Sequence, residues 1–324
     1  MSDTHAARPT DLVALVTFDG EVRENQAVTR EAIGREPDTP RPLSAALEQW
    51  LGLGRQTWVT VEGRAVQGIA TARDLSKSAW ILDTLIDADC AGGDGHVLRD
   101  LLRQAARAAE HARVTHILLR TPAGSPAIEA ALLAGFVAAL HERLWRGRTL
   151  DALAPDPDAL PDAHGTIVVR PAVGADTFGL FQLYNRALPL EARQALAMTL
   201  DEWTALRERR WCARGGGLVA VADDRIVGAL RIGSDDERTQ VELMLDPGPG
   251  CAAAGRALLD AAAARAGARA VLALVPLAAA ATERVLRERG LEPSTEYVLL
   301  SRRVARPVRE LARAHAGVVI PSRG

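Results

Sequence analysis

Hydrophobic positions follow two different spacings in the first half of the chain. Mostly apolar runs over 80–86 and 114–120 predict buried strands, the second of them covered on both faces. Between them, leucines and alanines recur at helical spacing over 97–110 and predict an amphipathic helix. A glycine-rich turn over 90–96 joins the first strand to this helix. Consecutive glycines let the backbone approach a ligand closely, so the turn is a candidate phosphate cradle at a helix N-terminus.

The same periodicities predict strands and helices on both sides of this unit. In the first half we expect strands over 57–62, 65–73 and 137–145 and a helix over 125–133. In the second half we expect strands over 166–170, 218–222, 225–232, 241–245, 270–275 and 297–304, and helices over 176–186, 190–209, 256–266 and 282–289. This alternation predicts an α/β protein (α+β in some schemes) with twisted mixed β-sheets flanked by helices.

The order of these elements occurs twice, which indicates an internal repeat. Val59–Gly68 aligns with Val219–Gly228 at an offset of 228 − 68 = 160. A constant offset of 160 carries Leu85 to Leu245 and Gly95 to Gly255 without a gap. Beyond the helix the offset falls to 155. We therefore predict that one supersecondary plan has been used twice.

The segment between the two copies has a different composition. Residues 151–162 contain three prolines and four aspartates and show neither a strand nor a helix period. The sequence therefore predicts a first domain over 1–150 with a shortened first strand, a linker over 151–165, a second domain over 166–305 and a tail over 306–324.

Composition narrows the class of protein. The chain has 324 residues, 48% of them hydrophobic and 25% charged, which is ordinary for a globular protein of about two domains. A net charge of −2 and 4% aromatic residues argue against nucleic-acid binding. Three cysteines are too few for a disulfide framework and form no C-x-x-C metal motif, so we expect a reducing, cytoplasmic location and no metal site. No apolar stretch is long enough to predict a membrane span.

Both copies resemble the GNAT (Gcn5-related) N-acetyltransferase superfamily. The features that carry the resemblance are a hairpin ending in Gly68 or Gly228, the strand and glycine-rich loop that follow, and a helix ending at Gly135 or Gly290. The resemblance covers nearly the whole chain outside the linker and the tail. It implies two GNAT-like domains that use acetyl-CoA as co-substrate. It also implies a small-molecule amine as acceptor, and it is compatible with a homodimer.

The superfamily's pyrophosphate-binding loop reads [Gln/Arg]-x-x-Gly-x-[Gly/Ala], and each copy matches it in part. In the first copy it falls on 90–95, and in the second on 250–255. The resemblance thus implies that the cofactor-binding residues are Leu85, Ile86, Gly92, Gly93, Gly95 and His96 in the first copy and Leu245, Ala253, Gly255 and Arg256 in the second.

The two loops differ in which defect they carry. The first keeps its glycines but contains aspartates, whereas the second lacks the first glycine and is less acidic. We favour the first loop, because a carboxylate can rotate away from a phosphate and a methyl group cannot. Gly93→Glu should then abolish CoA binding, and an unchanged affinity would favour the second copy.

The resemblance also implies a strand carboxylate that removes the amine's proton through water. Asp83 and Glu242 are the candidates, although alternation along a strand would also place them at solvent. The superfamily's usual tyrosine acid has no counterpart, since its positions are Ala131 and Leu286. Trp203 and Trp211 belong either to the core or to the wall of a substrate cavity.

Two functional hypotheses follow from these residues. The first is direct acyl transfer from acetyl-CoA to a small amine. The alternative is a catalytically degenerate acyl-CoA-binding or scaffold protein, in which both loops have lost their activity.

Overall fold

The computed structural model describes residues 2–19, 24–34, 42–52, 54–63, 65–88, 95–150, 167–207, 214–248, 250–267 and 269–304. Gly92, Gly93 and Trp211, the linker and the tail lie outside these described residues. Among the described helices, none is both long enough and apolar enough to cross a bilayer.

The first half of the chain contains six strands and four α-helices among its described residues. In chain order they are β1 (Asp3–Ala6), α1 (Leu12–Asp19), α2 (Pro42–Trp50), β2 (Arg55–Glu62), β3 (Ala65–Ser76), β4 (Ala79–Asp87), α3 (His96–Ala112), β5 (His116–Pro122), α4 (Ala127–Leu133) and β6 (Val137–Gly147).

The second half repeats this order with one more helix. Its elements are β7 (Val168–Pro171), α5 (Thr177–Ala187), α6 (Leu190–Ala195), α7 (Leu200–Ala205), β8 (Arg214–Ala222), β9 (Arg225–Ser234), β10 (Arg238–Leu245), α8 (Cys251–Ala266), β11 (Ala270–Pro276), α9 (Ala280–Glu288) and β12 (Glu292–Arg303). The single helix predicted over 190–209 is instead two short helices, because Thr199 caps α7 with its side chain and starts a new helix there.

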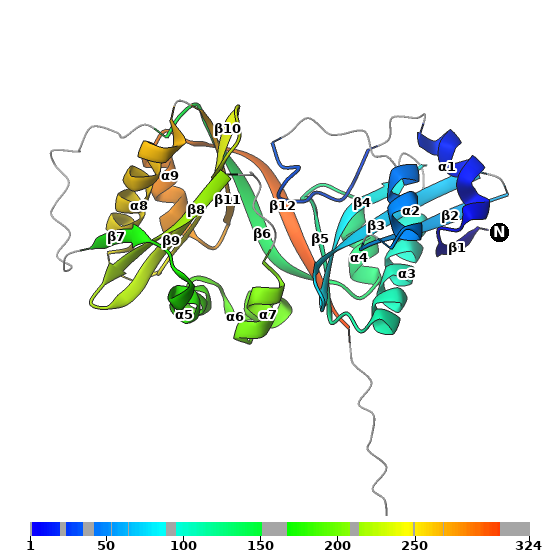
Figure 1. The fold of residues 1–324 in the computed structure, drawn as a ribbon, viewed down its shortest axis with the longest axis horizontal. Coiled ribbons are helices and arrows are strands. Elements are labelled where there is room, and N and C mark those ends of the chain that lie inside the picture. The colour runs from blue at the N-terminus through cyan, green and yellow to red at the C-terminus, as the bar shows by residue number, and fades with distance from the viewer. Residues whose placement is uncertain are drawn as a thin grey trace, which may run out of the picture.

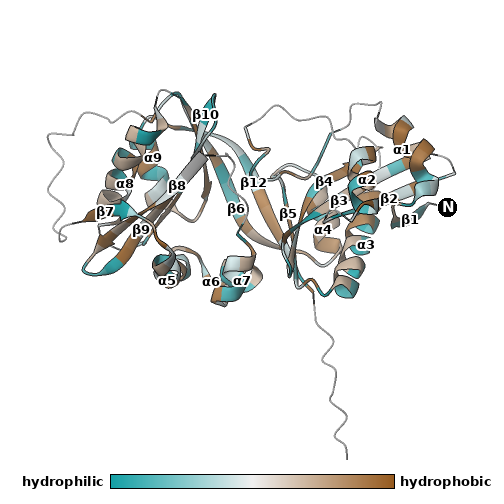
Figure 2. Cartoon of the chain, viewed as in Figure 1, coloured by the Kyte–Doolittle hydropathy of each residue, from teal (hydrophilic) through white to brown (hydrophobic). Residues whose placement is uncertain are grey.

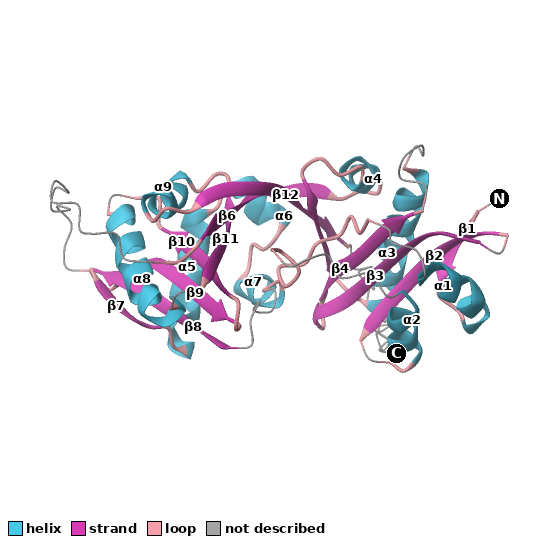
Figure 3. Ribbon diagram, turned by 90° about the horizontal axis from the view of Figure 1, so that it is seen from above, coloured by secondary structure: helices cyan, strands magenta, loops and turns pink. Residues whose placement is uncertain are grey.

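All described strands form one sheet in the order β1-β2-β3-β4-β5-β12-β6-β11-β10-β9-β8-β7. The last strand of each half pairs with a strand of the other half: β12 pairs with β5, and β6 pairs with β11. We call β6 and β12 the exchanged strands. Figures 1 and 3 show β6 and β12 crossing between two lobes, with α1–α4 in one lobe and α8 and α9 in the other. The division into two domains therefore stays a prediction, since each lobe contains a strand from the other half.

Each lobe has its own large hydrophobic core, and the exchanged strands contribute to both. The first core packs α3 against β2–β5 and includes Val298 and Leu300 from β12. The second packs α8 against β8–β11 and includes Trp145 from β6. Figure 2 shows the hydrophobic part of β12 in the middle of the molecule, between the lobes. The burial of β12 side chains in the first core and of a β6 side chain in the second thus stabilises each strand within the other half.

Strand pairing corrects the register predicted for the repeat. Ala70 pairs with Leu85 and Leu230 pairs with Leu243, so the counterpart of Leu85 is Leu243, at an offset of 243 − 85 = 158. The extra residue in the first copy is Asp83, which the β3–β4 pairing skips at a register shift.

In the helices that follow, the offset between the two copies is smaller by one more residue. The buried positions of α3, among them Leu98 and Leu101, match those of α8 at an offset of 258 − 101 = 157. Gly255 therefore corresponds to Leu98, and the predicted match of Gly95 with Gly255 is wrong. Identical letters 160 residues apart are less informative than the positions that pack against the sheet.

One histidine lies where the exchanged strand β12 pairs with β5. His116 begins β5 and pairs with Arg303 of β12. Burial, and then the nearby Arg303, lower the pKa of His116 below 6.5. The folded state thus binds fewer protons than the unfolded chain once the pH falls below about 6.5, which costs stability. This loss of unfolding free energy is absent above about pH 6.5. It grows as the pH falls and becomes constant below the pKa of His116 in the folded protein.

We therefore predict that His116→Leu reduces the acid sensitivity of the fold. Urea unfolding at pH 7.5 and 5.5 should show a larger loss of unfolding free energy in the parent chain than in the variant. An equal loss in both proteins would mean that other groups dominate this pH range.

Candidate functional site

The strands of the second copy separate beside the second of the two predicted cofactor loops. β10 and β11 pair in parallel from Arg238 with Ala270 to Val241 with Ala273, and the described pairing ends there. Asp246 donates its backbone N–H to Val227 on the β9 side, so alternation turns the backbone groups of Leu243 and Leu245 away from β9 and toward the opening.

A cavity of about 410 Å³ lies at this opening. Its floor is formed by β10 and by residues of β11 and α9 that face it, including Leu243, Leu245, Leu274 and Pro276. A concave and largely apolar space with a few convergent polar groups is the usual form of a small-molecule site.

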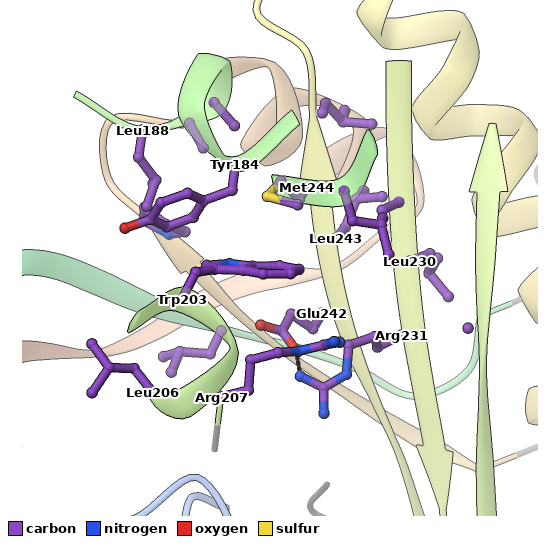
Figure 4. A pocket seen from close by; sticks show the side chains of 18 of the residues that line it. Tyr184, Leu188, Trp203, Leu206, Arg207, Leu230, Arg231, Glu242, Leu243 and Met244 are labelled. Atoms are coloured by element: carbon purple, nitrogen blue, oxygen red, sulfur yellow. Dashed lines mark hydrogen bonds and ion pairs between the residues drawn. The ribbon is translucent and has the colours of Figure 1, made fainter. Parts of the chain in front are cut away.

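The helices that follow the linker form the opposite wall. Tyr184 of α5 and Trp203 of α7 have ring centroids 6.1 Å apart, and Phe181 lies 6.0 Å from each. The Arg207 guanidinium carbon lies 4.9 Å from the centre of the Trp203 ring. Figure 4 shows the Trp203 ring between Tyr184 on one side and Arg207 on the other. The sequence left open whether Trp203 belongs to the core or to the wall of a cavity. In the structure it does both, since it packs against a hydrophobic cluster and also lines the cavity.

Tyr184 is poorly suited to donate a proton into this cavity. Its hydroxyl donates to the carbonyl of Ala197 at 3.2 Å. Burial raises the pKa of Tyr184 to about 12. The positions Ala131 and Leu286, at which the superfamily would place its tyrosine, are both fully buried core residues.

Charged side chains from both halves of the chain gather at one end of the cavity. Glu242 of β10 accepts from Arg231 of β9 at 2.7 Å and lies 3.0 Å from Arg30. Arg30 also reaches Glu142 of β6 at 3.4 Å, and Glu142 accepts from Arg120 of β5 at 2.7 Å. Both side chains of the last pair are fully buried, whereas Glu242 is 39% exposed. Two guanidiniums thus fix Glu242 in position while part of its side chain stays accessible.

The loop and helix that follow β10 carry the second predicted cradle. Gly250 is the N-cap residue of α8, with a φ of 80°. Because glycine has no side chain, no side-chain hydrogen bond caps the helix, and we call its start uncapped in this sense. The backbone N–H groups of its first turn, at Ala253 and its neighbours, therefore lie at an uncapped helix start. Gly255 faces inward: a Cβ there would lie 2.9 Å from Leu245 and 3.2 Å from Val285, so this glycine lets α8 pack closely. Arg256 contacts Glu288 at 3.0 Å.

Asp246 lies beside this loop, with its negative charge offset by arginines. Burial alone would raise the pKa of Asp246, but hydrogen bonds from Arg225 and Arg186 outweigh it and the pKa lies below its ordinary value. Its carboxylate accepts from Arg186 at 2.6 Å and from Arg225 at 2.5 Å. The surroundings of the second loop thus favour an anion despite the aspartate.

In the first copy the corresponding opening is filled by the chain itself. β4 and β5 pair in parallel only from Ala79 with His116 to Ile81 with Leu118. Residues 24–34, which we call the strap, run through the gap beyond. Gln26 donates its N–H to Leu85 O at 2.8 Å, Val28 donates to Arg120 O at 2.7 Å, and the Asn25 side chain accepts from Leu85 N at 2.8 Å. The strap therefore uses the backbone groups of β4 that face the opening.

The strap then continues into the second half. Ile33 packs with Leu144, Leu272 and Leu274, and Gly34 accepts from Arg238 at 2.5 Å. Gly34 has a φ of 74°, and a Cβ at this position would lie 2.4 Å from Leu272. The strap thus joins the filled opening of one copy to the open cavity of the other.

The two predicted carboxylates therefore have different surroundings. Asp83 contacts Arg55 and accepts from Thr71 at 2.5 Å, and its carbonyl accepts from Asn25 of the strap. Glu242 lines the cavity.

The predicted cofactor residues separate in the same way. Leu245 lines the cavity, Leu85 lies under the strap, and Ile86 is buried in the core behind α1. Gly95 is the N-cap of α3 with a φ of 69°, and His96 is the first residue of that helix.

Several cavity residues were not predicted. Arg30, Arg207, Arg231 and Tyr184 line the cavity together with Glu242. The alternation of β9 opposite β10 gives a signal for Arg231, which pairs directly with Glu242. No sequence pattern indicates Arg30, because it comes from the other copy. The described residues contain no group of three or more side chains suited to hold a metal ion.

Comparison with known proteins identifies the fold. The structure is similar to a GCN5-related N-acetyltransferase from Sphaerobacter thermophilus, with a TM-score of 0.52, 19% identity, and coverage of 94% of this chain and 96% of that one. No family model and no curated protein matches the sequence. The chain therefore has the GNAT fold that its sequence predicts, and the order of its elements occurs twice.

Two further solved structures are similar over most of this chain. One is a tandem GNAT protein from the clavulanic acid biosynthesis pathway, with a TM-score of 0.47 and 14% identity over 94% of this chain and 99% of that one. The other is a conserved protein of unknown function from Enterococcus faecalis V583, a probable N-acyltransferase, with a TM-score of 0.48 and 9% identity over 94% and 72% of the two chains.

Proposed function

We propose that this chain is an acetyl-CoA-dependent N-acyltransferase with one active site, in the second copy, that acts on a small amine by direct transfer. The observation that carries the proposal is the asymmetry between the two openings. A cavity lies beside β10, whereas the strap hydrogen-bonds along β4 in the first copy. This asymmetry supports an active site in the second copy, whose loop the sequence alone disfavours.

The residues present fit acetyl-CoA at the second opening. The backbone groups of Leu243 and Leu245 face the gap, where an extended pantetheine arm can add like a strand. The uncapped start of α8 and the arginines beside Asp246 suit a pyrophosphate. In the first copy, the strap occupies the same groups of Leu85, and Leu98 replaces the glycine at the helix.

The proposed chemistry uses Glu242 as general base. The carboxylate takes a proton from the bound ammonium through a water molecule, and the amine nitrogen attacks the thioester carbonyl carbon. A carbon–nitrogen bond forms, and the carbon–sulfur bond breaks with its electron pair leaving on sulfur. The second proton of the attacking nitrogen passes through water to the departing thiolate, since the Tyr184 hydroxyl donates to Ala197. Arg30 and Arg231 keep the carboxylate aimed into the cavity.

A purely structural role for the whole protein is less consistent with these observations. A scaffold has no need for a cavity of about 410 Å³ with an accessible carboxylate. The filled opening instead indicates that only the first copy has become structural.

Calorimetry with CoA and acetyl-CoA tests the location of the site. We expect one binding site per chain, which Ala253→Glu abolishes and Gly93→Glu leaves unchanged. Residue 253 lies in the first turn of α8, where an added carboxylate repels a pyrophosphate but favours the helix itself. A loss of affinity therefore reports on the ligand and not on folding.

Thiol release from acetyl-CoA with a panel of amines then tests the activity. Two equal sites, or sensitivity to Gly93→Glu alone, would contradict the assignment to the second copy. CoA binding without thiol release would leave an acyl-CoA sensor.

A further inference from the structure

The charged end of the cavity lies away from the predicted pyrophosphate site. Glu242 and Leu245 are three residues apart on β10, which is roughly 10 Å along a strand. The uncapped start of α8 follows Leu245, whereas Arg30 and Arg231 contact Glu242. The arginines around Glu242 therefore belong to the end at which an acceptor would bind, and not to the end suited to the phosphates of CoA.

The described residues that line the cavity carry an excess of positive charge. Among the described residues that line it, three are arginines (Arg30, Arg207 and Arg231) and two are glutamates (Glu142 and Glu242). Glu142 also neutralises the buried Arg120 behind the wall. In a concave site with apolar walls, such an excess favours a ligand with a negative charge and disfavours one with several positive charges.

Arg207 is the arginine best placed to recognise an anion. Its guanidinium lies 4.9 Å from the Trp203 ring, and this contact restrains the plane of the group. A restrained guanidinium presents two parallel N–H donors along one edge, which match the two oxygens of a carboxylate. Figure 4 shows Arg207 extending along the Trp203 ring toward Glu242 and Arg231.

The rest of the acceptor end is apolar. Its side chains come from the residues that directly follow α5, α6 and α7, from β5 and from the exchanged strands β6 and β12: Leu188, Leu196, Leu206, Leu118, Leu140 and Leu299. We propose that the acceptor is an amine with an apolar body and a carboxylate, such as an apolar α-amino acid, whose carboxylate Arg207 binds while Glu242 faces its amine. This inference rests on the proposed function and specifies its acceptor.

Matched acceptors test the role of the carboxylate directly. Phenylalanine and phenethylamine share an amine and an aromatic body and differ in the carboxylate, as do tryptophan and tryptamine. The kcat/KM for thiol release should be roughly 10- to 100-fold higher for the amino acid of each pair, as expected for charge-assisted hydrogen bonds. Arg207→Gln should remove this preference by lowering kcat/KM for the amino acid only, with the KM for acetyl-CoA unchanged.

A second arginine supplies the matched control. Arg287 lies 5.5 Å from the Trp145 ring and is exposed outside the cavity. Arg287→Gln removes the same kind of contact and should leave the preference intact. An equal loss for both acceptors in Arg207→Gln would overturn the proposal, as would a preference of the parent chain for the decarboxylated amines.

Binding of products tests the same inference without turnover. Calorimetry in the presence of CoA should show N-acetylphenylalanine binding at least tenfold more tightly than N-acetylphenethylamine, and Arg207→Gln should abolish the difference. Equal affinities would overturn the anionic acceptor even if the enzyme acylates other amines. A selective affinity for the anionic product without thiol release would instead overturn the proposed activity and leave the binding inference standing.

Discussion

Glu242→Gln should lower kcat for acyl transfer by about 10²- to 10⁴-fold, the range expected when a general base is removed. Glutamine keeps the size of the side chain and its contacts with Arg30 and Arg231 but cannot accept the proton of the ammonium. The KM for acetyl-CoA should change little, because Glu242 lies three residues before Leu245 on β10, away from the loop proposed to bind the pyrophosphate. Steady-state thiol release at saturating acetyl-CoA measures this effect.

Asp83→Asn is the matched control for this experiment. Asp83 is the other predicted strand carboxylate, but it contacts Arg55 and Thr71 beside the strap. We expect its removal to reduce stability and to leave kcat within about twofold. The contacts of Asp83 with Arg55 and Thr71 lie in the first copy, away from the proposed active site, and so contribute to folding rather than to acyl transfer. A large loss of kcat in Asp83→Asn together with a normal Glu242→Gln would place the active site in the first copy.

Arg30→Met should reduce both the activity and the stability of the protein. The guanidinium lies between Glu142 and Glu242, so its loss leaves a fully buried carboxylate with less compensation and frees Glu242 to move. We expect kcat to fall roughly tenfold and the unfolding free energy to fall by about 2 kcal/mol. The acidic limb of the kcat/KM profile should also move to higher pH, because a positive charge near the base has been removed.

Two neighbouring substitutions separate positioning from simple destabilisation. Arg30→Lys keeps the charge and should restore most of the pH profile, although it cannot contact both carboxylates as a planar fork does. Glu31→Gln breaks another ion pair of the strap, with Arg73 at 2.9 Å, and should leave kcat unchanged. A normal pH profile in Arg30→Met would show that Arg30 only stabilises the fold.

These predictions depend on a strand exchange that links the two copies. Glu142 lies on β6 from the first half, pairs with Arg120 of β5, and lines the cavity of the second half. Leu299 of β12 lines the same cavity while pairing with Arg120 of β5. The cavity therefore needs both halves of the chain, and the filled first copy supplies part of its wall.

The local pattern of the sequence was sufficient to predict much of this protein. Apolar strands with period two, amphipathic helices and glycine-rich turns depend on neighbouring residues, so the repeated strand–turn–helix units and the GNAT fold could be inferred before any contact was known. Glu242 could be selected in the same way, because a carboxylate in an apolar strand is unusual.

Only the tertiary structure decided which copy has an open site. The partners of β6 and β12 are set by long-range pairing, and similar strands in the two halves offer nearly the same hydrogen bonds to either neighbour. The path of the strap depends on Asn25 and Gln26 bonding to Leu85, and no spacing in the sequence encodes this contact. The sequence determined two similar frameworks, and the packing of one against the other determined that a cavity with residues from both lies beside Glu242.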